Sequence, residues 1–230
     1  MTIESFLITV SVWIVPVLLA VTLHEAAHGW AAWKLGDDTA WRMGRVTFNP
    51  LRHIDPMGTV ILPALLLLAS GGQMMFGFAK PVPVAFHALR HFRRDMVLVA
   101  AAGPGTNLLL ALASAGLGHV LPLLPGGFLQ GWLAANILNS VWINCLLAVF
   151  NMIPLPPLDG GRVAVGALPP FLGRHLARLE RTGIVILLLA LFALPWLGHR
   201  IGLDLDVFPW LVGAPAEYLS GLVFLAMGMR

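Results

Sequence analysis

The chain has 230 residues, of which 58% are hydrophobic and 11% are charged. Soluble domains average about 25% charged residues, so this composition excludes a soluble globular protein and predicts an integral membrane protein. The isoelectric point near 9.8 could indicate a nucleic-acid partner, but the positive-inside rule explains the excess of Lys and Arg, and no nucleic acid is expected. Cys145 is the single cysteine, which excludes an intramolecular disulfide framework.

Five apolar segments are long enough to cross a bilayer core, which needs about 20 residues per helix. They are residues 5–33, 96–118, 132–153, 182–198 and 207–229. The uncharged segment 57–79 is interrupted by proline and glycine, so we expect it to be re-entrant, with a sixth full crossing as the alternative. Basic loops on both sides of this segment, and a third at 162–181, predict an external N-terminus and a cytoplasmic C-terminus.

Two stretches are predicted to be extended. Residues 40–48 contain alternating and β-branched residues, and residues 76–84 include Pro81 and Pro83, which an edge strand accepts but a central strand does not. The predicted fold class is therefore an all-α polytopic membrane protein with five to six transmembrane helices, a re-entrant segment and short membrane-associated β-strands. We expect a single domain over residues 1–230.

The motif His24-Glu25-Ala26-Ala27-His28 ends the first apolar segment. Two histidines four residues apart lie on one face of a helix, where their ring nitrogens can converge on one Zn²⁺. Glu25 lies beside them and could take a proton from a metal-bound water. Residues 6–23 contain no Asp, Glu, Lys or Arg, so the pattern predicts a hydrolytic metal site in the membrane.

A catalytic zinc site typically has three protein ligands, so one more is needed. Asp159 is the main candidate, because prolines within residues 154–157 stop the preceding helix and two glycines after Asp159 allow a tight turn. Glu217, alone in the last apolar segment, is the rival. Asp204 and Asp206 are expected to be solvated loop residues.

Three motifs in this order resemble those of the site-2 proteases, a family of intramembrane zinc metalloproteases. They are the His24–His28 motif, Gly103-Pro104-Gly105-Thr106-Asn107, and Asn151 with Pro154, Pro156 and Leu158-Asp159-Gly160. The resemblance implies that His24, His28 and Asp159 bind one zinc ion and that Glu25 is the catalytic base. It also implies that Asn107 and Asn151 contact the substrate or the oxyanion.

The resemblance further implies a compact bacterial endopeptidase, without PDZ or CBS domains, in the inner (cytoplasmic) membrane. Its catalytic core would span about 5–165, with additional helices over about 166–230. The expected substrates are transmembrane segments of membrane-bound regulators, anti-sigma factors or leftover signal peptides, cleaved near the cytoplasmic side. Residues 76–84 could pair with a locally unwound substrate by β-addition.

Other functions use similar residues. A membrane zinc transporter could employ the same ligands but does not need Glu25 as a base, and a binding-only pseudoprotease would not need the intact set. A zinc protease of the prenyl-protein type would normally have a downstream Glu ligand on a helix, whereas the motif around Asp159 points elsewhere.

Two further groups of polar residues each have more than one explanation. Asn136, Ser140, Asn144 and Asn151 form a polar stripe at four- and seven-residue spacing, which serves either the site or hydrogen bonding between helices. His53 and Asp55 could approach the site, but they are better explained as turn and interface residues.

Overall fold

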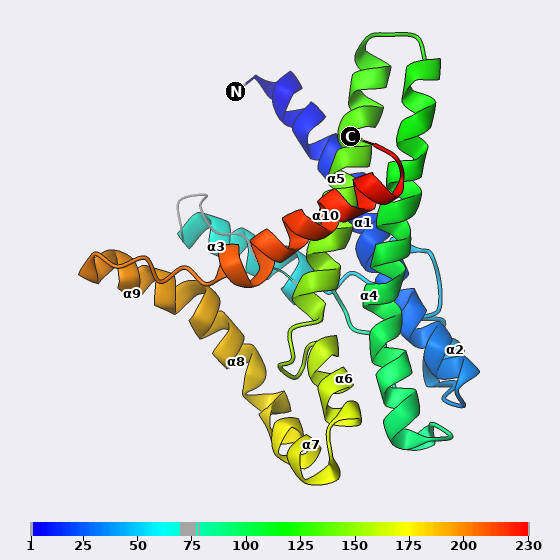
Figure 1. Cartoon of the computed structure of the whole chain (residues 1–230), viewed down its shortest axis with the longest axis vertical. Coiled ribbons are helices and arrows are strands. Elements are labelled where there is room, and N and C mark those ends of the chain that lie inside the picture. Colours follow the sequence, from blue (N-terminus) through cyan, green and yellow to red (C-terminus); the bar gives the residue numbers. More distant parts are fainter. Residues whose placement is uncertain (1, 70–76, 78, 230) are drawn as a thin grey trace.

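Three long helices form the centre of the protein: α1 (Ile3–Lys34), α4 (Phe92–Leu117) and α5 (Phe128–Asn151). They pack against one another, and α10 (Ala214–Ala226) crosses α4 and α5 (Figure 1). This architecture is seen in a computed structural model, which describes residues 2–69, 77 and 79–229.

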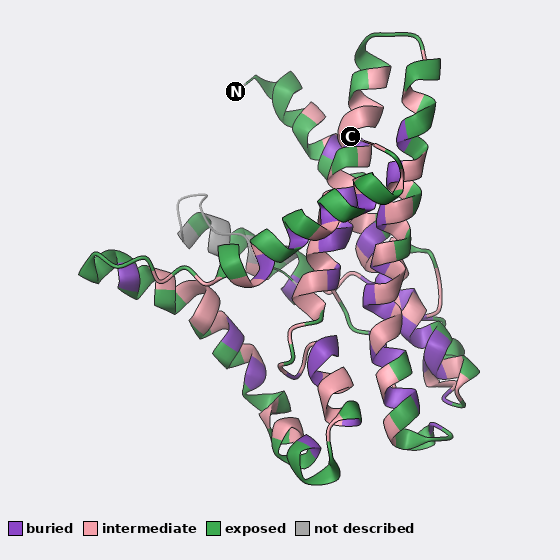
Figure 2. Ribbon diagram, viewed as in Figure 1, coloured by how far each residue is buried: buried purple, intermediate pink, exposed green. Residues whose placement is uncertain are grey.

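Small side chains allow the central helices to approach closely. One buried cluster joins α4, α5 and α10 and consists of Ala111, Ala115, Val141, Cys145 and Val223. Between lipid-embedded helices the attraction is mainly van der Waals packing, which small residues favour because they bring the backbones together. The buried residues accordingly concentrate where α1, α4 and α5 meet, and outer faces remain exposed and apolar (Figure 2).

Among the described residues, four helical segments are long and apolar enough to cross a membrane: Ile3–Lys34, Phe92–Leu123, Phe128–Asn151 and Gly183–Ile201. They correspond to four of the five predicted crossings. The fifth predicted segment is helical from Pro209 through α10, but it is not among these four. The protein is therefore an all-helical membrane protein over the described residues, and the number of crossings stays a prediction.

The predicted re-entrant segment begins as a helix that runs through Pro56–Ile61 (η2) and α3 (Leu62–Ala69). A helix over residues 56–69 is about 21 Å long at 1.5 Å per residue, shorter than the hydrocarbon core of about 30 Å. Residues 70–76 and 78 of this segment lie outside the described residues, so re-entry itself stays a prediction.

The predicted β-strands are wrong for the described residues. Residues 40–48 begin in the short helix α2 (Thr39–Arg42) and continue as turns, and residues 79–85 run without regular structure; residues 76 and 78 lie outside the description. Residues 79–85 form no strand because their backbone N–H groups bond to other partners. Lys80 donates to the backbone carbonyl of His53, and Val82 donates to a side chain, while Pro81 has no N–H to offer a neighbouring strand.

After α5, an irregular loop with three prolines leads into α6 (Asp159–Ala167), and the chain continues through helices that extend away from the central bundle (Figure 1). The remaining helical elements are η1 (Pro50–Arg52), η3 (Phe86–Ala88), η4 (Gly118–Leu123), α7 (Pro170–Ala177), η5 (Arg178–Arg181), α8 (Gly183–Leu188), η6 (Leu189–Ala193), α9 (Leu194–Ile201) and η7 (Pro209–Gly213). This course places the first residue of α6 beside the middle of the bundle, where the site lies.

Candidate metal centre

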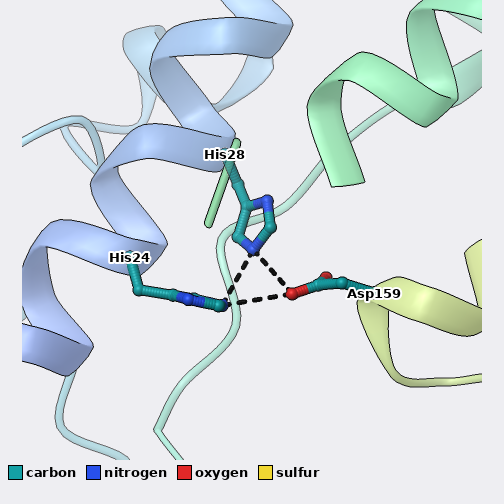
Figure 3. Close-up of side chains that lie close together, drawn as sticks. All are labelled: His24, His28 and Asp159. Atoms are coloured by element: carbon teal, nitrogen blue, oxygen red, sulfur yellow. Dashed lines mark hydrogen bonds and ion pairs between the residues drawn. The ribbon is translucent and has the colours of Figure 1, made fainter. Parts of the chain in front are cut away.

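Two side chains of α1, His24 and His28, and one of α6, Asp159, meet at one point (Figure 3). The Nε2 atoms of His24 and His28 are 3.0 Å apart, and the Oδ2 atom of Asp159 lies 3.2 Å from the first and 3.3 Å from the second. All three residues are buried, with 6–8% of their surface exposed. The structure thus brings together the three side chains that the sequence predicted to bind zinc.

The opposite nitrogen of each imidazole faces a hydrogen-bond acceptor. His24 Nδ1 lies 2.6 Å from the side-chain oxygen of Asn107, and His28 Nδ1 lies 2.8 Å from the backbone carbonyl of Val99. Because both acceptors require a donor, the proton of each neutral imidazole resides on Nδ1. Both Nε2 atoms then present lone pairs towards Asp159.

Three acceptor atoms therefore converge, the Nε2 atoms of His24 and His28 and Oδ2 of Asp159, and none of them carries a proton. Asp159 Oδ2 is buried and has no hydrogen-bond partner. Such a set of lone pairs is stabilised by a shared cation.

The donor set and its spacing fit zinc. Two imidazole nitrogens and one carboxylate are a typical ligand set of catalytic zinc, which leaves a fourth position open. Two donors bound to one tetrahedral zinc at about 2.0–2.2 Å lie about 3.3–3.5 Å apart, close to the 3.0–3.3 Å separations found here. Small adjustments of the side chains would suffice to accommodate the ion.

Asp159 is positioned by close backbone packing. It is the first residue of α6, and the glycines after it lie against the preceding loop. A Cβ atom on Gly160 would overlap the Met152 carbonyl, and one on Gly161 would overlap the backbone nitrogen of Pro156. These two glycines are therefore required for close approach within a helix, whereas the sequence suggested a tight turn.

Gly103 on α4 lies directly against the two imidazoles. A Cβ atom at this position would be 2.6 Å from Cε1 of His24 and would overlap Nε2 of His28. The glycine of the Gly-Pro-x-x-Asn motif thus makes room for the face of α1 that carries His24 and His28.

Glu25 is held by a backbone group of the segment that follows the predicted re-entrant region. Its Oε2 atom accepts a hydrogen bond of 2.8 Å from the N–H of Val82. The same segment is tied down by Arg45, whose guanidinium donates to the Lys80 carbonyl at 2.8 Å, and by Asp37, which accepts from the Ala85 N–H at 2.6 Å. Residues 80–85 therefore pass next to the predicted base.

The other predicted residues have varied surroundings. Asn107 is fully buried and bonded within the protein, whereas the Asn151 amide donates to the Leu147 carbonyl of its own helix at 3.0 Å. Contact of either with a substrate stays a prediction. His53 is buried 3.1 Å from the Thr47 carbonyl, and Asp55 accepts from the Gly58 N–H at 2.7 Å.

The rival acidic residues lie apart from the cluster. Glu217 is exposed on α10, and Asp204 and Asp206 are exposed in the loop before it. The grouping of possible metal ligands found among the described residues contains none of them.

Sequence reasoning missed the roles of Gly103, Asn144 and Val82. Gly103 carried a signal, because it precedes the asparagine of its motif by four residues, one helical turn. Asn144 belongs to the predicted polar stripe, but its partner depends on how α4 and α5 pack. Val82 acts through its backbone, which no residue pattern reveals.

Comparisons with known proteins show which class of enzyme the chain resembles. Residues 130–194 match the family described as Peptidase family M50. The chain is 38% identical over 189 residues to "Putative zinc metalloprotease YwhC" of Bacillus subtilis, which covers 79% of this chain and 80% of that protein.

Mycobacterial relatives give a similar result. The chain is 31% identical over 192 residues to "Putative zinc metalloprotease Rip2" of Mycolicibacterium smegmatis, covering 81% of this chain and 67% of the relative. The protein of the same name from Mycobacterium tuberculosis is 32% identical over 178 residues, which cover 76% of this chain and 64% of the relative. No solved structure matches the chain.

The fold and the His-His-Asp cluster thus define a helical membrane protein with a candidate metal centre. The chain belongs to peptidase family M50, the site-2 proteases, and is a metalloendopeptidase. The predicted family and enzyme class are confirmed.

Proposed function

We propose that this protein is an intramembrane endopeptidase in which His24, His28 and Asp159 bind one Zn²⁺ and Glu25 is the catalytic base. The observation that carries the proposal is the convergence of three buried lone-pair donors at 3.0–3.3 Å from one another. Relatives named as zinc metalloproteases support zinc as the ion.

When bound, zinc would lower the pKa of a coordinated water towards 7 and polarise the scissile carbonyl. Glu25 follows His24 directly on α1 and would take the proton of that water, later returning it to the leaving amine. The Val82 N–H holds Oε2 of Glu25, which restricts the orientation of the carboxylate while its second oxygen can take the proton.

The substrate we propose is a transmembrane segment of a membrane protein, such as a membrane-bound regulator or a leftover signal peptide. The first helix is uncharged from residue 6 to residue 23 and leads directly to His24, which supports a site within the membrane. The basic loops support a cytoplasmic position for the end of α1 that carries the motif, in the bacterial inner membrane.

The direct test compares the natural protein with Glu25→Gln, both purified in detergent. Zinc content and cleavage of a model transmembrane substrate are measured in the same preparations. Glu25→Gln preserves the shape of the side chain and leaves all three proposed ligands, so we expect zinc in both proteins and cleavage by the natural protein alone. Cleavage by the variant at the natural rate, or a natural protein without zinc, would contradict the proposal.

A further inference from the structure

We propose that Asn107 and Asn144 form a positioning pair that fixes His24 in the tautomer and orientation needed to bind zinc. The inference rests on the proposed zinc site and adds residues that act through His24 rather than on the substrate. Its basis is a chain of hydrogen bonds that runs from α5 through α4 to α1.

The neighbours of Asn107 fix the orientation of its side-chain amide. An amide has an acceptor oxygen and a donor nitrogen, and a flip of its plane exchanges them. The nitrogen of Asn107 faces two acceptors, the Ala20 carbonyl at 3.3 Å and the side-chain oxygen of Asn144 at 2.8 Å. The oxygen of Asn107 is therefore directed to His24, at 2.6 Å from Nδ1.

The amide of Asn144 is oriented in the same way. Its nitrogen donates to the Ser140 carbonyl at 2.8 Å, one turn earlier on α5. A flip would place the Asn144 oxygen against that carbonyl and its nitrogen against the nitrogen of Asn107. The backbone of α5 thus determines the orientation of Asn144, which determines that of Asn107.

The burial of the pair makes this orientation costly to lose. Asn107 is fully buried and Asn144 is 1% exposed, so water cannot replace a lost partner without rearrangement. A buried polar group left without a partner costs about 1–3 kcal/mol. With the amide fixed, His24 carries its proton on Nδ1 and keeps the lone pair on Nε2 for the metal.

The two histidines are held in different ways. His28 is oriented by the Val99 carbonyl, which is part of the backbone of α4. His24 depends on a side chain, and so its orientation can be tested by substitution.

The experiment measures zinc affinity by chelator competition, and thermal unfolding of the zinc-free protein, for the full chain in detergent. Asn107→Leu removes the acceptor at nearly unchanged shape. Asn107→Asp is the conservative rescue, because a carboxyl oxygen keeps an acceptor facing Nδ1 of His24. Asn144→Leu removes the partner that orients Asn107.

Asn139→Leu is the matched control. Like Asn144, Asn139 lies on α5. Like Asn107, it donates to a carbonyl of α1, that of Val12 at 2.9 Å, but this bond does not lead to His24. If the Asn107 amide served only to stabilise the fold, its removal would lower the unfolding temperature, as removal of the Asn139 amide would, without changing zinc affinity.

We expect Asn107→Leu to weaken zinc binding about 10–100-fold, as outer partners of metal ligands do, and Asn144→Leu to weaken it by less. Asn107→Asp should bind zinc more tightly than Asn107→Leu, and Asn139→Leu should bind it as the natural protein does. Equal zinc affinity in the natural protein, Asn107→Leu and Asn144→Leu would overturn the pair while leaving the proposed function intact. A natural protein that binds no zinc would overturn both.

Discussion

Replacing Gly103 by alanine should disrupt the metal centre without disrupting the helix that carries it. The new Cβ atom would stand 2.6 Å from Cε1 of His24 and would overlap Nε2 of His28. Carbon atoms in favourable contact are about 3.5–4.0 Å apart, so an imidazole must move by about 1 Å. Alanine is preferred to glycine within a helix by about 1 kcal/mol, so α4 itself has no reason to unfold.

The magnitude follows from how little a metal site tolerates. Ligand distances in a working site stay within about 0.2 Å of their usual values, several times less than the displacement that the new methyl group requires. We therefore expect zinc affinity to fall at least about tenfold, which corresponds to about 1.4 kcal/mol, and cleavage to fall with it.

The assay is zinc affinity by chelator competition, with thermal unfolding of the zinc-free protein measured in parallel. Gly105→Ala is the control, because it makes the same chemical change two residues along α4 at a position where a Cβ atom meets nothing within 4 Å. Gly105→Ala should keep zinc and activity. Natural zinc affinity in Gly103→Ala would refute the close approach of α4 to the two histidines.

Two other substitutions test how the site is supported. Gly161→Ala places a Cβ atom against the backbone of Pro156, so it should destabilise the protein by about 1–3 kcal/mol and weaken zinc binding through Asp159. Gly131→Ala is the control, because a Cβ atom there meets nothing within 4 Å, and it should change neither stability nor zinc binding. Equal unfolding temperatures and zinc contents in the two variants would count against the prediction. Asp37→Ala removes the buried carboxylate that accepts from the half-buried Ala85 N–H at 2.6 Å, so thermal unfolding should show a loss of about 1–3 kcal/mol. No change in unfolding temperature would argue against this anchor.

The grouping of the candidate metal ligands was predictable because residues of these types are rare where they occur. Two histidines one turn apart in an otherwise uncharged helix define one face, and few carboxylates were available to complete it. Asp159 was favoured over Glu217 because prolines stop the helix before it and two glycines after it allow a tight turn, and the structure places Asp159 with the histidines.

The remaining features depend on tertiary packing that local patterns do not encode. The pattern of residues 76–84 favoured an edge strand, but side chains of α1 and of the loop after it occupy the N–H groups of Val82 and Ala85. The polar stripe on α5 was visible from its spacing, yet only the rotation of α4 against α5 pairs Asn144 with Asn107. Spacing identifies a face of a helix but does not identify what that face meets.

The central claim is that His24, His28 and Asp159 bind the zinc ion, and X-ray absorption at the zinc edge tests it most directly. For the zinc-loaded natural protein we predict one zinc per chain, with two imidazole nitrogens and oxygen ligands at about 2.0–2.2 Å and no sulfur. Asp159→Asn should lower the zinc content under the same conditions. Zinc without imidazole ligands, or an unchanged spectrum and zinc content in Asp159→Asn, would contradict the account.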